Sequence, residues 1–179
     1  MTMSDKEVGQ VTAQVRRAGS EQWLVYRDLR LAALAEAPYA FSSTLERELA
    51  FDDQVWQQRL GAPAAATFLA WDGEQVVGMA TGKPEDPDDE FAVPGAWQLV
   101  GMWVSPAVRG TGVAGALVEA VAGHVRDAGA PALVLWVTEV NDRARSFYER
   151  IGFATTGSRQ PVRPDEPGHW EIQLVRHYG

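Results

Sequence analysis

The sequence predicts a single mixed α/β (α+β) domain. The length of 179 residues suits one domain, hydrophobic residues make up 46% of the chain, and strand-like apolar runs alternate with helix-like segments. The expected order is a strand, two helices, three strands, a helix, a strand, a helix and two final strands. Residues 1–9 are expected to form a flexible polar tail, so the domain comprises residues 10–179.

The first third of the chain predicts one strand and two helices. Residues 11–16 alternate weakly in hydrophobicity, as a half-buried strand does. Ser20 is expected to cap a helix over residues 21–35, because a serine hydroxyl accepts hydrogen bonds from the first helical N–H groups. Asp52 or Asp53 is expected to cap a second, short helix in the same way.

The middle of the chain predicts a hairpin and a third strand. Residues 66–71 and 75–82 form the hairpin, with Asp72-Gly73 in a type I′ turn. Residues 83–95 are rich in proline and acidic residues, which indicates a solvated loop. The third strand is residues 97–104.

The second half of the chain predicts two helices and three strands. One helix covers residues 112–128, and the strand at 133–137 is apolar at every position, as a strand buried on both faces is. Asn141 is expected to cap the next helix, which ends at Gly152. The last two strands are residues 153–158 and 169–175.

Composition excludes several classes of function. There are no cysteines and the three histidines are scattered, so neither a protein-bound metal nor a cysteine nucleophile is expected. A net charge of −8 argues against a nucleic-acid partner and favours a cationic small substrate through long-range attraction. No membrane span and no signal peptide are recognised, which predicts a cytoplasmic protein with no membrane partner.

The most informative segment is the glycine-rich turn at residues 108–115. It lies between a predicted strand and a predicted helix, where free backbone N–H groups and the helix dipole attract a phosphate. Its glycines at 110, 112 and 115 also match the GxGxxG pattern of dinucleotide-binding proteins, with Glu139 at the end of the next strand. However, residues 105–109 separate Gly110 from the strand, and too few residues follow for the rest of a doubly wound sheet.

The same turn also reads as Arg-x-x-Gly-x-Ala over residues 109–114. LVGMWVSP precedes it, and NDRARSFYERIGF follows the next strand. Together these segments resemble the GNAT superfamily of acetyl-CoA-dependent N-acetyltransferases. The resemblance covers roughly residues 11–176 in element order and is most specific over 98–115 and 135–153.

The resemblance implies a twisted mixed sheet that splays open between its fourth and fifth strands, flanked by about four helices. Acetyl-CoA is the implied cosubstrate and would lie in the gap. Backbone groups of the fourth strand would pair with the acetyl and pantetheine groups, and the turn would hold the pyrophosphate. Asn141, at the start of the helix after the fifth strand, would contact the pantetheine arm. The residues implied are Met102, Trp103, Val104, Arg109, Gly110, Thr111, Gly112, Val113, Ala114, Asn141 and Phe147. Without the resemblance, Asn141 is simply a helix cap and Phe147 a core residue.

Tyr148 matches the position where this superfamily commonly has a tyrosine general acid. A phenol beside the gap would donate a proton to the departing thiolate. The alternative is a core aromatic residue that packs with Ile151 at helical spacing.

The general base is less evident. No carboxylate occurs within residues 97–104, where some relatives carry a glutamate, so Glu139 is the candidate base that lies nearest in sequence. A solvated strand end explains Glu139 equally, and a water chain would serve as an alternative base. Trp97 and Trp103 fall on one face of their strand by its period of two, where they would line an acceptor site or belong to the core.

These observations predict direct transfer of acetyl from acetyl-CoA to a primary amine, on a small molecule or a peptide. The alternatives are an acetyl-CoA-binding regulatory domain without turnover and a nicotinamide-dependent oxidoreductase. A homodimer is expected by resemblance alone.

Overall fold

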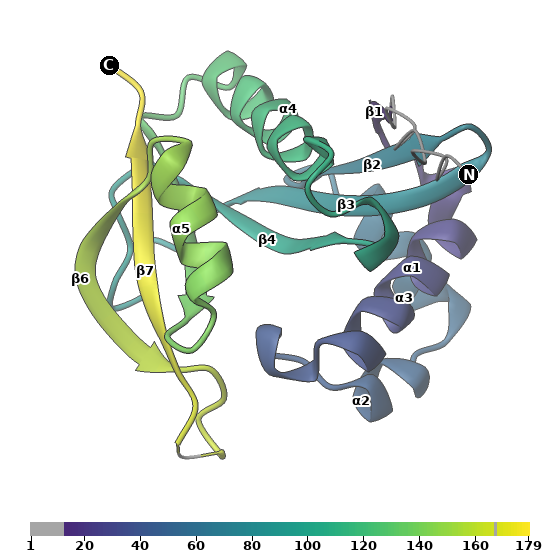
Figure 1. Cartoon of the computed structure of the whole chain (residues 1–179), viewed down its shortest axis with the longest axis horizontal. Helices are drawn as coiled ribbons and strands as arrows, with labels where there is room; N and C mark the ends of the chain where they lie inside the picture. Colours follow the sequence, from purple (N-terminus) through teal and green to yellow (C-terminus); the bar gives the residue numbers. More distant parts are fainter. Residues whose placement is uncertain (1–12, 167) are drawn as a thin grey trace, which may run out of the picture.

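The computed structural model describes residues 13–166 and 168–179, and within them a seven-stranded sheet is flanked by helices (Figure 1). The strands are β1 (Gln14–Arg17), β2 (Ala66–Asp72), β3 (Gln75–Pro84), β4 (Trp97–Val104), β5 (Ala132–Thr138), β6 (Ala154–Pro161) and β7 (Trp170–His177). The α-helices are α1 (Trp23–Glu36), α2 (Leu45–Leu49), α3 (Asp53–Gly61), α4 (Val113–Asp127) and α5 (Asp142–Arg150), with short 3-10 turns at Ser20–Gln22, Pro38–Ala40 and Pro106–Val108. The expected tail at residues 1–9 and the start of the first predicted strand lie outside the described residues.

The sheet has the strand order β1-β2-β3-β4-β5-β7-β6. All neighbours pair antiparallel except β4 and β5, which run parallel, so the prediction of a mixed sheet is confirmed. β4 and β5 pair only at Trp97 with Leu133 and at Gln98 with Val134. Beyond those pairs the two strands diverge, and the sheet divides into a β1–β4 half and a β5–β7 half (Figure 1). The predicted splay between the fourth and fifth strands is therefore confirmed.

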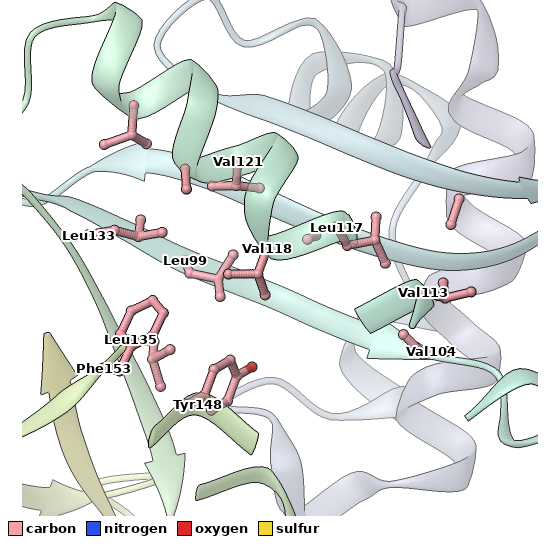
Figure 2. Packing of buried hydrophobic residues seen from close by; sticks show 14 of the residues in the cluster. Leu99, Val104, Val113, Leu117, Val118, Val121, Leu133, Leu135, Tyr148 and Phe153 are labelled. Atoms are coloured by element: carbon pink, nitrogen blue, oxygen red, sulfur yellow. The ribbon is translucent and has the colours of Figure 1, made fainter. Parts of the chain in front are cut away.

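Two layers of helices cover the β1–β4 half. α4 buries an apolar stripe against β2, β3 and β4, which includes Leu117, Val118 and Val121, and Val118 lies beside Leu99 (Figure 2). On the opposite face, α1 packs Leu29, Ala33 and Leu34 onto another cluster, which includes Trp103. Burial on both faces fixes this half of the sheet, and with it the position of β4.

A β-bulge interrupts β4 at Gly101 and Met102. Met79 of β3 pairs with Trp103 but Thr81 pairs with Val100, so two residues of β4 oppose a single residue of β3. Gly101 has φ +62, in the left-handed region that favours glycine. The extra residue shifts the alternation of side chains, so Trp97 packs with the α4 cluster and Trp103 with the α1 cluster. The expectation that the two tryptophans share a face was wrong.

Two of the three helix caps predicted from the sequence are observed. The side chain of Asn141 accepts a hydrogen bond from the N–H of Ala144 at 3.1 Å, and that of Asp52 accepts one from Val55 at 3.0 Å, so both predicted caps are confirmed. Ser20, by contrast, begins a 3-10 turn, and α1 starts at Trp23 without a side-chain cap. The hairpin turn is Gly73-Glu74, with only Gly73 at positive φ, which fits type II′ and not the predicted type I′.

Within residues 13–166 and 168–179, no helix has the length and hydropathy that a membrane crossing requires.

Candidate active site

The divergence of β4 and β5 opens a cavity of about 1020 Å³. Its wall includes β4 from Gln98 to Met102 and β5 from Leu135 to Thr138. Asn141, Ala144 and Tyr148 close it on the α5 side, and side chains of α1, α2 and α3 close it on the other. Because the two strands pair only at one end, the cavity lies within the sheet itself. Its volume is typical of pockets that bind a cofactor or another small molecule.

The predicted phosphate turn follows β4 after the short 3-10 turn at Pro106–Val108. Gly110 and Gly112 have φ of +87 and +92, and a Cβ on either would meet open space. Gly112 is also the N-cap of α4, so the first amide groups of that helix have no intrahelical acceptors and point out of its N-terminus. Thr111 turns inward and donates its hydroxyl hydrogen to the carbonyl of Val108 at 2.6 Å. An exposed helix N-terminus behind two left-handed glycines has the character of an anion site.

Arg109 does not project freely from this turn. Its Nη2 lies 2.8 Å from Oε2 of Glu36 at the end of α1, and its Nε donates to the carbonyl oxygen of Val104 at 3.0 Å. The indole N–H of Trp103 donates to the same Glu36 oxygen at 3.0 Å. The hydrogen bonds from Arg109 and then from Trp103 hold the pKa of Glu36 below its usual range. Arg109 therefore ties the turn to α1 and to the end of β4.

The three β4 residues implied as backbone ligands differ in their surroundings. Met102 lines the cavity next to the bulge. Trp103 and Val104 are buried at 9% and 6% exposure and pack on opposite sides of the sheet. The carbonyl of Val104 already accepts from Arg109, whereas the bulge residues Gly101 and Met102 both line the cavity.

Tyr148 is buried, with 7% of its surface exposed. Its ring packs at 5.7 Å from that of Phe153, and its hydroxyl points away from Phe153 and Leu135 (Figure 2). Tyr148 lines the cavity, and burial raises the pKa of its hydroxyl far above the usual value. The phenol is thus protonated throughout the physiological range. Phe147 packs against the same core cluster, 5.1 Å from the Tyr148 ring.

Asn141 lies at the cavity wall while its side-chain oxygen caps α5. Both of its expected environments, helix cap and cavity wall, therefore occur together.

Glu139 lies in an ion pair at the edge of the site. Its carboxylate oxygens accept from Nε and Nη2 of Arg159 at 2.5 and 2.9 Å. These hydrogen bonds hold the pKa of Glu139 below its usual range. A carboxylate whose pKa is lowered in this way is a poor proton acceptor, so the geometry does not favour Glu139 as the base.

Several polar residues of the cavity were missed by the sequence analysis. Glu171 of β7 and Thr138 of β5 are paired in the sheet, and both line the cavity. Alternation along the last strand places Glu171 on its polar face, but only the register of three strands brings it to the cavity. Glu48 also lines the cavity; it is fully buried between α1, α2 and α3, where Arg30 and Arg59 donate to it.

The wall of the cavity is richer in cations than the chain as a whole. Its basic residues are Arg30, Arg47, Arg59, Lys83 and Arg159, and its acidic residues are Glu48, Glu90 and Glu171. Within the described ranges, Arg47 and Lys83 form no ion pair. The net charge of −8 therefore does not describe the cavity wall, which presents more cationic than anionic side chains.

A comparison with protein families decides between the readings of the turn. The sequence profile of the acetyltransferase (GNAT) family matches residues 26–153, which include β4, the turn, β5 and Tyr148. The chain belongs to the GNAT acetyltransferase family. The nicotinamide interpretation of the three glycines has no such support, and the 3-10 turn at Pro106–Val108 keeps Gly110 apart from the strand end.

This GNAT protein resembles two mycothiol acetyltransferases in sequence. The one from Thermobispora bispora is 32% identical over 136 residues, which cover 74% of this chain and 42% of that protein. The one from Parafrankia sp. is 30% identical over 158 residues, which cover 80% of this chain and 47% of that protein. The chain thus spans less than half the length of these relatives.

Solved structures share the fold. An acetyltransferase of the GNAT family from Streptococcus pneumoniae has a TM-score of 0.74 at 16% identity, over 93% of this chain and 99% of its own. A GCN5-related N-acetyltransferase from Kribbella flavida has a TM-score of 0.71 at 23% identity, over 93% and 98% of the two chains.

Proposed function

We propose that this protein transfers the acetyl group of acetyl-CoA directly to a primary amine within the cavity between β4 and β5. The observation that carries the proposal is the combination of a split parallel strand pair, a glycine turn at the N-terminus of α4, and a buried tyrosine that lines the cavity. The GNAT family uses acetyl-CoA as its cosubstrate, which agrees with these features.

The turn between β4 and α4 is suited to the pyrophosphate. Backbone N–H groups from Gly110 to Ala114 would donate to its oxygens, and Gly112 lets the backbone approach without a Cβ. Asn141, on the opposite wall, would contact the pantetheine arm with the side-chain NH₂ that the helix cap leaves unused. Met102 and the other exposed backbone of β4 would pair with the arm as a neighbouring strand does.

The β-bulge supplies the group that stabilises the oxyanion. The amide groups at Gly101 and Met102 fall outside the regular ladder with β3, and both residues line the cavity. A backbone N–H aimed at the thioester oxygen strengthens its interaction as negative charge develops there.

Tyr148 acts as the general acid. As the carbon–sulfur bond breaks, the phenol donates its proton to the departing thiolate, and the nitrogen of the collapsing intermediate provides the proton that restores it. Because burial raises the pKa of Tyr148, the hydroxyl remains protonated at every pH at which the enzyme is expected to work.

The test is the release of free thiol from acetyl-CoA with amino acids, polyamines, aminoglycosides and peptides as acceptors. Tyr148→Phe is expected to lower turnover at least about 10-fold while it leaves acetyl-CoA affinity unchanged, because only the transferable proton is lost. Tyr39→Phe, at an exposed position outside the cavity, is the matched control. Unchanged turnover in Tyr148→Phe would remove Tyr148 from this role.

The same assay tests the alternative of a regulatory domain, which would bind acetyl-CoA and release no thiol with any acceptor. A small-molecule or peptide amine is the proposed acceptor class. The cationic wall favours amines that also carry a carboxylate or another anionic group. Cytoplasmic localisation and a homodimer stay predictions.

A further inference from the structure

Three polar side chains from the three strands of the β5–β7 half form one row. Thr138 of β5 pairs with Glu171 of β7, and Glu171 pairs with Gln160 of β6. Directly paired residues lie on the same face of a sheet, and all three line the cavity. The row lies on the free side of the split, beyond the point where β5 has left β4.

The side-chain hydroxyl of Thr138 has no hydrogen-bond partner among the described residues. The residue is 6% exposed, and its Oγ1 is buried. A buried hydroxyl without a partner costs on the order of 1–3 kcal/mol, so such a group in a cavity wall indicates a ligand that supplies the missing bond. A hydroxyl can accept from an ammonium N–H and can donate to other groups.

Glu171 contributes the carboxylate of this row, and this group favours a cationic ligand. Nε2 of Gln160 donates to Oε1 of Glu171 at 2.8 Å, which orients the carboxylate and leaves Oε2 available. Burial raises the pKa of Glu171, and the hydrogen bond from Gln160 offsets this only in part. Among the residues that the structure describes, no cation forms an ion pair with Glu171. The other charged groups of the wall outside the Arg30–Glu48–Arg59 cluster and Arg47 are Arg159, which is held by Glu139, and the exposed Lys83 and Glu90.

The other polar groups of the wall are less suited to accept a proton. Glu48 is saturated by Arg30 and Arg59, and Glu139 by Arg159. Gln98 on β4 carries an amide, which is not basic. Glu90 lies exposed on the loop after β3. Glu171 is thus the partly buried carboxylate of the wall that is free of an arginine.

We propose that the acceptor amine binds between Thr138 and Glu171, and that the carboxylate of Glu171 takes its proton. This inference rests on the proposed acetyl transfer. The ammonium R–NH₃⁺ gives one proton to Glu171 and becomes R–NH₂, whose lone pair then attacks the acetyl carbon. When the carbon–sulfur bond breaks, Tyr148 protonates the sulfur and recovers the second proton from nitrogen, while Glu171 releases the first to solvent. The products are the acetamide R–NH–CO–CH₃, the free thiol and one proton.

An alkylammonium with a pKa near 10.4 is neutral only about once in a thousand molecules at pH 7, so a base beside the amine has a large effect. Glu171→Gln keeps a hydrogen-bonding side chain of the same shape but cannot take the proton. We expect kcat/KM at pH 7 to fall at least about 10-fold, and the deficit to shrink toward pH 9.5 as the free amine becomes available from solution. A purely structural role would give a deficit that does not change with pH.

The acceptor for this assay is the fastest of spermidine, kanamycin and an alanyl peptide in the wild type. Glu149→Gln, exposed on α5 outside the cavity wall, is the control for loss of a carboxylate. Glu139→Gln tests the competing base: a pH-dependent loss in that variant, with none in Glu171→Gln, would overturn the proposal. Thermal melting of each variant shows whether it is folded.

A second measurement is independent of turnover. In protein labelled with carbon-13 at the glutamate carboxyl groups, the resonance that disappears in Glu171→Gln belongs to Glu171. It is expected to titrate above the usual glutamate range and to shift on addition of n-butylammonium chloride. Tetramethylammonium chloride, which has no N–H to donate, should have little effect, and Thr138→Val should weaken the n-butylammonium response. No shift with n-butylammonium would refute the amine site even if acetyl-CoA binds. Failure to bind acetyl-CoA would contradict the proposed function. It would not change what the n-butylammonium response shows about the amine site.

Discussion

Arg109 is the residue whose role the structure changes most. The sequence pattern predicts a phosphate ligand, but the guanidinium group contacts Glu36 and the carbonyl of Val104. Arg109 fastens the turn to β4 and α1, and we propose that it contributes to cofactor binding through the shape of the turn. Glu36 has the complementary role, because it accepts hydrogen bonds from both Arg109 and Trp103.

A double-mutant cycle separates these two roles of Arg109. If the arginine only shapes the turn, Arg109→Ala and Glu36→Ala should lower acetyl-CoA affinity by similar amounts, and the double variant should be little worse than either one. The loss of unfolding free energy in each variant should be about 1 kcal/mol or less, because the ion pair is partly exposed. A direct phosphate contact predicts instead that Arg109→Ala loses about 1–3 kcal/mol of acetyl-CoA binding that Glu36→Ala retains. Calorimetric titration of the three variants decides between these outcomes.

At the scale of elements, the turn before α4 depends on left-handed backbone at Gly112. A Cβ there meets no neighbouring atom, so the effect of Gly112→Ala is conformational: holding alanine at φ +92 costs about 1–2 kcal/mol. We expect lower thermal stability and weaker acetyl-CoA binding together. Gly123→Ala is the matched control, since this glycine lies inside α4 in equally open space and alanine should stabilise the helix by up to about 1 kcal/mol. Equal behaviour of the two variants in chemical denaturation would contradict the role of the turn.

The Arg30–Glu48–Arg59 cluster holds α1, α2 and α3 together at the edge of the cavity. Burial by itself would raise the pKa of Glu48, but the hydrogen bonds and charge of Arg30, with the charge of Arg59, bring it below its usual range. Glu48→Gln leaves the two arginines without a charged partner, and we expect a loss of about 3–5 kcal/mol of unfolding free energy. Because the folded-state pKa is lowered, the stabilisation by Glu48 is present above the unfolded pKa and disappears as the pH falls through the folded value. The difference in urea midpoint between wild type and Glu48→Gln should therefore narrow below about pH 4. A constant difference would refute the ion pair.

The sequence predicts elements well where the signal is local. The strand at residues 97–104, the cap at Asn141 and the buried strand after α4 follow from periodicity and capping, and the structure agrees on each. The bulge at Gly101 escapes such reasoning, because a period of two assumes that every residue is paired, and Trp103 was therefore assigned to the wrong face. The α2 helix, Leu45–Leu49, is too short to show a helical period.

The residues of the site likewise fall into those that local sequence motifs predict and those that only the tertiary structure brings together. The turn and Tyr148 belong to continuous sequence motifs and could be predicted from them. Thr138, Gln160 and Glu171 meet only through the register of three strands, and Glu48 meets its arginines only when three helices pack. The assignment of the base to Glu139 rested on distance along the chain, which does not show that Arg159 lies against it.

In the whole molecule, the two halves of the sheet are joined only by the short pairing of β4 with β5, and they diverge beyond it. Packing on both faces of the β1–β4 half fixes one wall of the cavity, and β5, β7 and α5 form the other. The proposed anion binding, oxyanion stabilisation and proton transfer fall on different elements around this cavity.

Calorimetric titration of the wild-type protein with acetyl-CoA, and separately with NAD, is the decisive test of the proposed cosubstrate. We predict saturable binding of acetyl-CoA at a single site and no heat of binding with NAD. At a hundredfold excess of acetyl-CoA over its dissociation constant, linkage adds about 2.7 kcal/mol to the unfolding free energy, so the melting temperature should rise in the same samples. Binding of NAD without binding of acetyl-CoA would contradict the proposed transfer of acetyl from acetyl-CoA.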